Sequence, residues 1–204
     1  MKFWTVVFLC AISIVNASLQ APTAASRGSK PIEVLLFDFG LGDNARSPEG
    51  LKLENELTLA LEKGLSQDKR LRISRFSRTH PAVKRAINEG SIPTGILIPP
   101  FTGKSGGEYK AQKLGRLLRA EFTVAGVVDR FAFQTNTKSA EMVVIVEVIN
   151  TKTNKLVTTL ASTITTNGEN ETEAGIAAVG KFAQEVAPKI IEAIVTPKKE
   201  KSGG

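Results

Sequence analysis

The stretch Gly103-Lys104-Ser105 is the part of the sequence that most suggests nucleotide chemistry. It follows an apolar run starting at Ile96 and precedes a helical pattern, which is the order of a phosphate-binding loop. Such a loop needs a glycine five residues before the Gly-Lys pair, and Ile98 stands there. Pro99 and Pro100 also lack the N–H groups that would hold phosphate. We therefore expect no nucleotide or other cofactor, and we interpret the stretch as a loop that contacts a partner.

Other residues that could support catalysis are few. Asp38 and Asp43 lie at and beyond the end of a predicted strand, where α/β sheets often bind ligands. A small-ligand site or a hydrolase centre at this corner is therefore the alternative to solvated turn residues, which we favour. His80, the single histidine, precedes Pro81 and is expected to cap a helix or lie on the surface. One histidine and one cysteine, Cys10, exclude the usual zinc sites, and we expect no metal and no enzymatic activity.

The N-terminus has the pattern of an export signal. Lys2 is its only charge, residues 3–15 are almost wholly apolar, and small residues follow. Cleavage is expected after Ala17, or as late as Ala21. Cys10 lies inside the apolar run, so it is not expected to carry a lipid. We expect an exported chain, periplasmic or extracellular, that is soluble and not lipid-anchored.

The chain is basic, with 27 Lys and Arg residues against 20 Asp and Glu and a net charge of +7. With one Tyr and one Trp, it offers little aromatic surface on which nucleic-acid bases could stack, so we expect no nucleic-acid partner. Attraction to an anionic envelope polymer or to lipid head groups is a further alternative. It would use the densest basic cluster, which comprises Arg70, Arg72, Arg75, Arg78, Lys84 and Arg85.

The hydrophobic pattern indicates one α/β (α+β) domain at residues 31–196, between a polar linker at 18–30 and a basic tail at 197–204. We expect a mixed sheet of about five strands packed by about four helices. The predicted strands are residues 32–39, 70–76, 121–134, 141–149 and 155–166, the last two forming a hairpin. The predicted helices are residues 48–65, 79–90, 109–119 and 172–195. The last of these is amphipathic, with its inward stripe at Ile176, Val179, Ala183, Val186, Ile190 and Ile194.

Two segments resemble a bacterial envelope family. Residues 111–131 contain a predicted helix with the pair Leu114-Gly115, followed by a predicted strand with a central glycine, Gly126. Residues 144–159 are similar to that family's next hairpin, whose turn often reads Asp-x-x-Thr-Gly, with Thr153-Asn154 here in place of Thr-Gly. The family includes the curli-secretion lipoprotein, lipoprotein activators of penicillin-binding proteins and the N-terminal domain of the Tol-system β-propeller protein. The resemblance implies a mixed sheet packed by helices and a non-enzymatic role.

These observations together predict an exported, non-enzymatic binding or assembly protein of the bacterial cell envelope. The partner is expected to be an envelope or secretion protein, or a second copy that pairs with an exposed edge of the sheet. We expect the contact surface to be the loop at residues 99–107 and its neighbours, with five contact residues: Phe101, Lys104, Tyr109, Arg72 and Arg75.

Overall fold

The central sheet combines two short strands with three long ones. The computed structural model describes residues 30–196, so the predicted export signal, most of the linker and the basic tail lie outside it. The strand order is β3 (Leu71–Arg75), β1 (Ile32–Leu36), β6 (Phe122–Gln134), β7 (Ser139–Asn150) and β8 (Lys155–Asn167). β1 runs parallel to β3 and β6, whereas β6, β7 and β8 are antiparallel neighbours. The predicted mixed sheet is confirmed.

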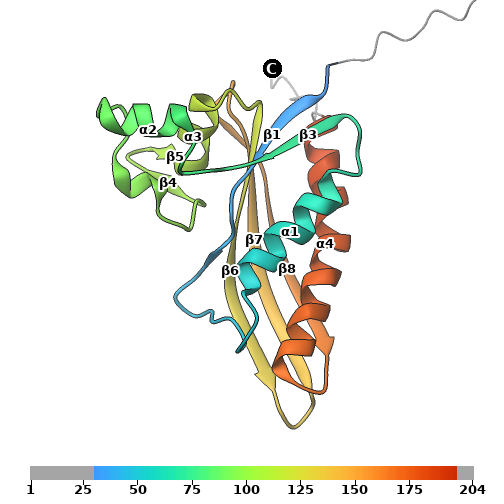
Figure 1. Cartoon of the computed structure of the whole chain (residues 1–204). Coiled ribbons are helices and arrows are strands. Elements are labelled where there is room, and N and C mark those ends of the chain that lie inside the picture. Colours follow the sequence, from blue (N-terminus) through green and yellow to red (C-terminus); the bar gives the residue numbers. More distant parts are fainter. Residues whose placement is uncertain (1–29, 197–204) are drawn as a thin grey trace, which may run out of the picture.

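Helices cover the two faces of this sheet unequally (Figure 1). One face is covered along its length by α1 (Leu53–Leu65) and α4 (Glu171–Val195). The other face is covered only at one end, by a small group of elements. This group comprises α2 (Pro81–Asn88), the 3₁₀ helix η1 (Thr94–Leu97), β4 (Lys104–Ser105), β5 (Glu108–Tyr109) and α3 (Lys110–Leu117). The two-residue strand β2 (Gly40–Leu41) pairs with β6 beside β1.

Two hydrophobic cores result, because successive side chains of a strand point to opposite faces. Val34 and Leu36 of β1 belong to the core beneath α1 and α4. Leu35 and Phe37 belong to the core beneath α2 and α3. The continuous apolar run that predicted a strand buried on both faces is explained by this arrangement.

The long strands extend well past the short ones. β6 has 13 residues and β1 has five, so at about 3.3 Å per residue β6 is longer by more than 25 Å. No helix of the described chain packs on the outer face of this extension (Figure 1). Its side chains are accordingly exposed, and they include Arg130, Ala132, Thr159, Ala161, Thr163 and Thr165.

Two boundaries differ from the sequence prediction. The predicted helix at residues 48–65 begins at Leu53, because Pro48 starts a turn that ends at Leu51. The N-cap residue is Lys52, and the Ser47 Oγ accepts the N–H of Leu53 in the first turn at 3.0 Å. The apolar run at Ile96 lies in η1 and does not form a strand, which removes the strand that a phosphate-binding loop requires.

The inward face of α4 also differs from the predicted stripe. Ile176 is 57% exposed, and the buried positions begin instead with Ala174, Gly175 and Ala178. A Cβ added at Gly175 would lie 2.8 Å from Leu51, so small residues permit the close approach of the 48–52 turn. At its N-terminal end, α4 therefore presents its smallest residues to the core, and Ile176 faces solvent.

The two segments that resemble the envelope family meet in space. A Cβ added at Gly115 of α3 would lie 2.3 Å from the Thr123 methyl and 2.8 Å from the Thr151 methyl. Thr151 is buried, and its hydroxyl donates to the carbonyls of Ala120 and Glu121. The Leu-Gly pair, the start of β6 and the hairpin turn thus form one packing unit.

The hairpin turn between β7 and β8 is stabilised by two asparagines. Asn150 Oδ1 accepts the N–H groups of Lys152 and Thr153 at 3.0 Å each, as an aspartate would. Asn154 has φ of 59°, in the left-handed region that glycine favours and that asparagine tolerates. Asn154 therefore adopts the backbone conformation that a glycine at this position of the turn would allow.

Gly126, the central glycine of β6, should be the least replaceable of these residues. A Cβ there would lie 2.1 Å from the Phe39 ring, so Gly126→Ala is expected to lower the free energy of unfolding by about 2–3 kcal/mol through overpacking. Gly180→Ala is the matched control, because a Cβ at this exposed helical position meets nothing within 4 Å. It should raise stability by about 0.5–1 kcal/mol. Urea unfolding would measure both, and equal effects would contradict the packing argument.

Candidate partner-binding surface

The predicted contact loop at residues 99–107 is anchored by a core residue. Phe101 is 1% exposed, and its ring centroid lies 4.8 Å from that of Phe37 and 5.2 Å from that of Phe76. Its side chain therefore stabilises the core beneath α2 and α3 and is not available to a partner, contrary to the sequence prediction. Deleting the loop would remove this ring, which typically costs about 3–5 kcal/mol.

The tip of the same loop is a short hairpin on the surface. Lys104 and Tyr109 are paired residues of β4 and β5, and the Lys104 Nζ lies 5.2 Å from the Tyr109 ring centroid. The Gly103 N–H donates to Glu147 Oε2 at 2.9 Å, which ties the hairpin to β7. The β4–β5 hairpin therefore brings Lys104 and Tyr109 together, and Lys104 is exposed.

The two predicted arginines do not join this hairpin. Arg72 lies opposite Glu33 in the β1–β3 register and forms an ion pair with it at 3.0 Å. Arg75 lies opposite Leu36, on the other face of β3, and forms an ion pair with Asp38 at 2.5 Å. The five predicted contact residues thus do not form a single surface, because alternation along β3 separates the two arginines.

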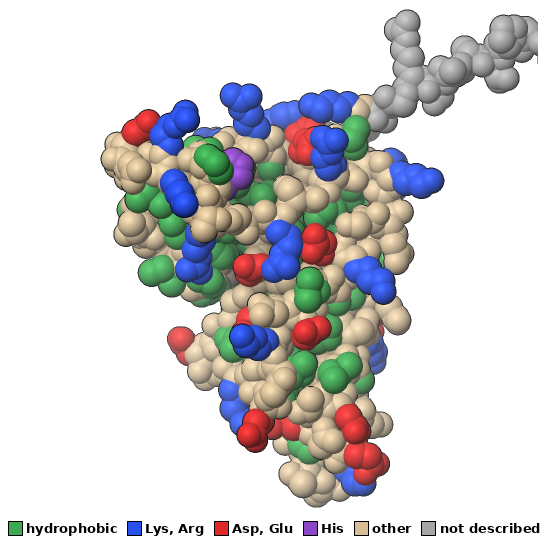
Figure 2. Space-filling model, viewed as in Figure 1, with side chains coloured by type: hydrophobic (Ala, Val, Ile, Leu, Met, Phe, Trp, Pro, Cys, Tyr) green, Lys and Arg blue, Asp and Glu red, His purple; other side chains and the backbone are tan. Residues whose placement is uncertain are grey.

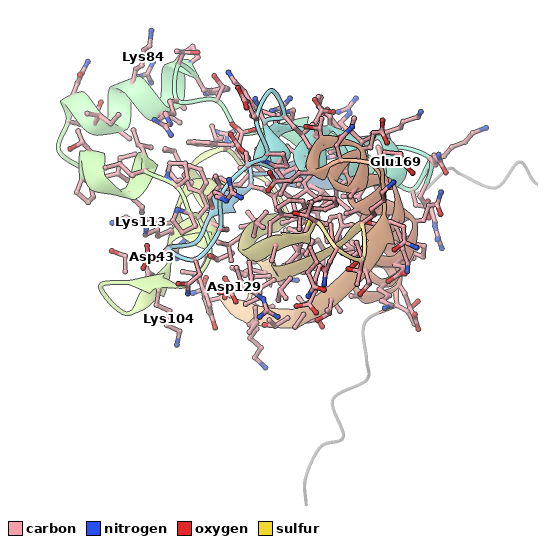
Figure 3. The ribbon with its side chains drawn as sticks, turned by 90° about the horizontal axis from the view of Figure 1, so that it is seen from below. Asp43, Lys84, Lys104, Lys113, Asp129 and Glu169 are labelled. Carbon is pink, nitrogen blue, oxygen red and sulfur yellow. The ribbon has the colours of Figure 1, made fainter. Side chains whose placement is uncertain are left out.

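The Asp38/Asp43 corner has the character of a solvated turn. The carboxylate of Asp38 is engaged by Arg75, and Asp43 is exposed in the turn before α1. Figure 3 shows Asp43 on the same side of the molecule as Asp129 and Lys104. Within residues 30–196, no three His, Cys, Asp or Glu side chains are placed to hold a metal ion. His80 caps α2 as predicted, since its Nδ1 accepts the Ala82 N–H at 3.2 Å.

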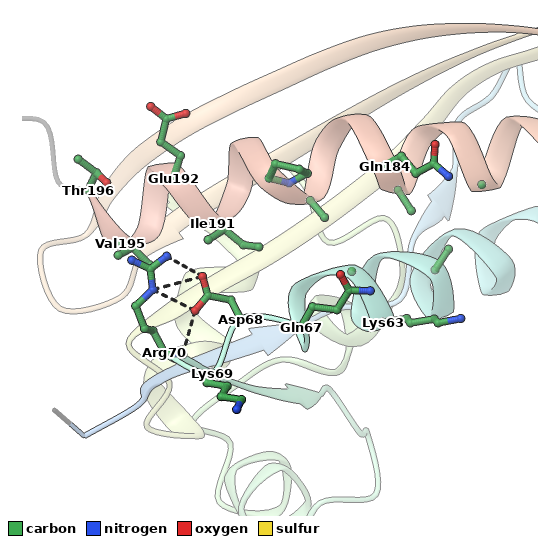
Figure 4. A pocket seen from close by; sticks show the side chains of 16 residues that line it. Lys63, Gln67, Asp68, Lys69, Arg70, Gln184, Ile191, Glu192, Val195 and Thr196 are labelled. Carbon is green, nitrogen blue, oxygen red and sulfur yellow. Dashed lines mark hydrogen bonds and ion pairs between the residues drawn. The ribbon is translucent and has the colours of Figure 1, made fainter. Parts of the chain in front are cut away.

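A groove of about 1090 Å³ lies between α1, α4 and the turn that follows α1 (Figure 4). Small residues line it because the helices approach closely, and a Cβ at Gly64 would lie 2.8 Å from the Ala187 Cβ. Its rim is charged, and Figure 4 shows Asp68 and Arg70 joined beside Val195 and Ile191. The shortest contact of this pair is 2.6 Å.

The Asp68 carboxylate is held in its charged form. Hydrogen bonds from the Arg70 side chain and backbone lower the pKa of Asp68 from 3.8 to about 2. The groove therefore presents a fixed ion pair at its rim over the whole physiological pH range.

A second groove, of about 780 Å³, lies between the start of β8 and the C-terminal half of α4. Leu156 and Val157 of β8, both 38% exposed, line it together with Ile194 and Lys189 of α4. The groove is thus partly apolar and adjoins the outermost strand of the sheet.

That strand, β8, pairs with no other strand on its far side within residues 30–196. The Gly168 N–H donates to the carbonyl of Lys138, so the backbone of Gly168 points toward β7. The Thr165 carbonyl instead points away from β7, since it accepts from the Lys181 Nζ of α4 at 3.3 Å. Because backbone groups point to the same side at every second residue, the odd-numbered residues of β8 present theirs to the free edge. We call this the edge surface: the outward backbone of Thr159, Ala161, Thr163 and Thr165, the adjoining α4 flank at Lys181, Glu185 and Lys189, and the second groove.

Solved structures share this arrangement of elements. Protein XCC0632 from Xanthomonas campestris matches with a TM-score of 0.51 at 9% identity, over 82% of this chain and 90% of that one. This likeness concerns the arrangement of helices and strands. Lipoprotein GNA1162 from Neisseria meningitidis matches with a TM-score of 0.46 at 11% identity, over 79% of this chain and 99% of that one. TolB from Acinetobacter baumannii matches with a TM-score of 0.39 at 11% identity, over 81% of this chain and 28% of that one.

Comparison of the sequence with protein-family models and with curated proteins finds no match. The likeness therefore concerns the fold and carries no site residues to this chain. Within residues 30–196, no helix combines the length and apolarity needed to cross a membrane.

Sequence reasoning missed the residues of the edge surface. The run at residues 156–167 contains no charge and no proline, which is a signal that the sequence did offer. It predicted a strand, but the position of that strand in the sheet is set by pairing, so its exposure could not be read from the run alone.

The Asp68–Arg70 pair provides a pH-dependent observable at the first groove. The folded-state pKa of Asp68 is depressed to about 2, so its contribution to stability is present above pH 4 and is lost as the pH falls through about 2. An NMR titration should show this midpoint, and Arg70→Leu should move it back toward 3.8 because the donor hydrogen bonds are gone. An unchanged midpoint in the variant would show that Arg70 is not the cause.

Proposed function

We propose that the protein is an exported, non-enzymatic binding and assembly protein of the bacterial cell envelope. It acts through protein–protein contacts at the edge surface. The observation that carries this proposal is the far side of β8, a strand of 13 residues beside a partly apolar groove. No other strand of the part of the chain that the structure describes pairs with that side.

A long free edge is a template for another strand, and natural proteins commonly block such edges with charges, prolines or covering elements. Between Leu156 and Asn167, β8 has neither charge nor proline. Lys181 of α4 engages the single carbonyl of Thr165. The edge is therefore suited to strand addition, in which main-chain hydrogen bonds give affinity and an adjoining pocket gives specificity.

The envelope location and the absence of catalysis belong to the same proposal. The export-signal pattern at the N-terminus and the resemblance of residues 111–131 and 144–159 to an envelope family support the location. Asp38, which would have to act in a catalytic corner, is instead engaged by Arg75 in an ion pair at 2.5 Å. The hairpin tip at Lys104 is a secondary contact in this proposal.

Site-specific photo-crosslinking in a bacterial host tests the proposal. A photoreactive residue at Thr163 should capture a discrete protein of the envelope fraction, because its backbone faces the free edge. The same residue at Glu89, exposed at the end of α2, is the matched control and should capture much less. Equal capture from both positions would contradict binding at the edge surface, and an uncut chain confined to the cytosol would contradict the envelope location.

A second candidate function is binding to an anionic envelope surface. Three members of the basic cluster are neutralised, since Arg70, Arg72 and Arg75 pair with Asp68, Glu33 and Asp38. The other three are exposed, and no carboxylate of the described chain pairs with them: Arg78, Lys84 and Arg85. Figure 2 shows Lys and Arg side chains over the end of the molecule that carries β3 and α2.

If this cluster binds an anionic surface, neutralising it should release the protein. Each residue near an anionic membrane is worth about 1 kcal/mol, so Arg78→Gln, Lys84→Gln and Arg85→Gln together should weaken binding to vesicles containing anionic lipid by about 100-fold. Arg72→Gln is the control and should have little effect, because Glu33 already neutralises it. Binding that is insensitive to salt would contradict this second function.

A further inference from the structure

We propose that the edge surface pairs with the same surface of a second copy, around a two-fold axis at Ser162. This inference rests on the proposed function, because it names the partner of that surface. The two β8 strands would run antiparallel and join two sheets into one continuous sheet. Three features of the described residues support it: the outward backbone groups, the charge pattern of α4 and the placement of that helix over the strand.

The backbone groups of β8 are self-complementary about Ser162. Odd-numbered residues point outward, so an antiparallel copy places Thr159 opposite Thr165 and Ala161 opposite Thr163. Every residue in these pairs supplies one N–H and one carbonyl to the new ladder, and Lys181 releases the Thr165 carbonyl that it engages in the single copy. Ser162 then meets its own copy at a position without hydrogen bonds, where facing Cβ atoms lie about 4.5–5.5 Å apart.

The flank of α4 is self-complementary as well. Lys181 reaches over the edge to the Thr165 carbonyl, and Lys189 lines the groove beside β8. Glu185 lies midway between them, so the three residues alternate in charge at four-residue spacing on one flank. Two antiparallel helices related by an axis between Lys181 and Glu185 place Lys181 of each copy opposite Glu185 of the other.

The position of α4 along β8 places Lys181 and Glu185 level with the proposed axis at Ser162. The Thr166 hydroxyl donates to the Ala174 carbonyl at 2.8 Å, which aligns these two positions of β8 and α4. Ser162 lies four residues away along the strand, about 13 Å, and the same distance along a helix corresponds to about nine residues. The axis therefore passes near Ala183, midway between Lys181 and Glu185. Lys181 of each copy faces Glu185 of the other.

A strand pair alone gives marginal stability, so the helix contact is a necessary part of the proposal. Helices pack at interaxial distances of about 8–10 Å. Adjacent strands lie about 4.8 Å apart, and α4 packs on both β7 and β8. Two copies of α4, each set slightly inward of its own β8, therefore come within packing distance across the axis.

Cysteine crosslinking tests the register. In a Cys10→Ser background, Ser162→Cys should form a disulfide-linked dimer under mild oxidation, because its copy lies within bridging reach. Ala161→Cys is the matched control. It is more exposed than Ser162, yet its copy lies diagonally at about 7–8 Å, beyond the reach of a disulfide. Crosslinking of Ala161→Cys equal to or above that of Ser162→Cys would overturn the proposed axis, as would failure of both.

The oligomeric state tests the charge pattern. Light scattering of the full chain, measured over concentrations up to about 100 μM, should show a dimer. This concentration range is high enough to measure a micromolar dissociation constant. Lys181→Glu should raise the dissociation constant about tenfold, since it places two carboxylates opposite each other at two symmetric positions. The double variant Lys181→Glu, Glu185→Lys should restore dimerisation. Thermal unfolding of each variant checks that it is folded.

The failure of this inference is distinguishable from the failure of the proposed function. A monomer at all concentrations, or a double variant that stays as weak as Lys181→Glu, would overturn pairing with a second copy. Capture of a different protein from Thr163 in cells would then still support the proposed function. Capture of this same chain from Thr163, lost on Lys181→Glu and regained in the double variant, would support both.

Discussion

The unequal length of the strands is the constraint from which the other features of this protein follow. β1 and β3 have five residues each, whereas β6, β7 and β8 have 12 or 13. A helix must be long to cover the antiparallel part, and α4 with its 25 residues extends about 37 Å. The elements on the other face are short, so they cover only the end where all five strands are present. No described helix or strand between residues 30 and 196 covers the rest of that face or the far side of β8.

The covered end is held together by residues that lack side-chain bulk. Gly126 leaves room for the Phe39 ring, and Gly115 leaves room for the methyl groups of Thr123 and Thr151. Because Thr151 also donates its hydroxyl to the carbonyls before β6, the hairpin turn is fixed to the start of the central strand. The residues that resemble the envelope family therefore specify packing of the sheet, which explains why they indicate a fold and not a site.

The open end differs from the covered end in its chemistry. Its outer face carries threonines and alanines with few charges, while most ion pairs lie around the short strands and the loops. The predicted contact residues fall in the covered end, where Phe101 is buried and both arginines are neutralised. The open edge of β8, with α4 and the adjoining groove, offers unpaired backbone groups and partly exposed apolar side chains instead.

The sequence by itself determined the class of fold, the long β6 strand, the β7–β8 hairpin and the amphipathic C-terminal helix, and it placed His80 either at a helix cap or on the surface. These depend on local periodicity, turn residues and caps, which act over a few neighbouring positions. Tertiary structure alone decided that Phe101 lies in a core, that Ile176 lies outside one, and that Arg72 and Arg75 occupy opposite faces of β3. It also decided that β8 is an edge strand. Each of these depends on which distant segments pack or pair together, and no local pattern of side chains contains that information.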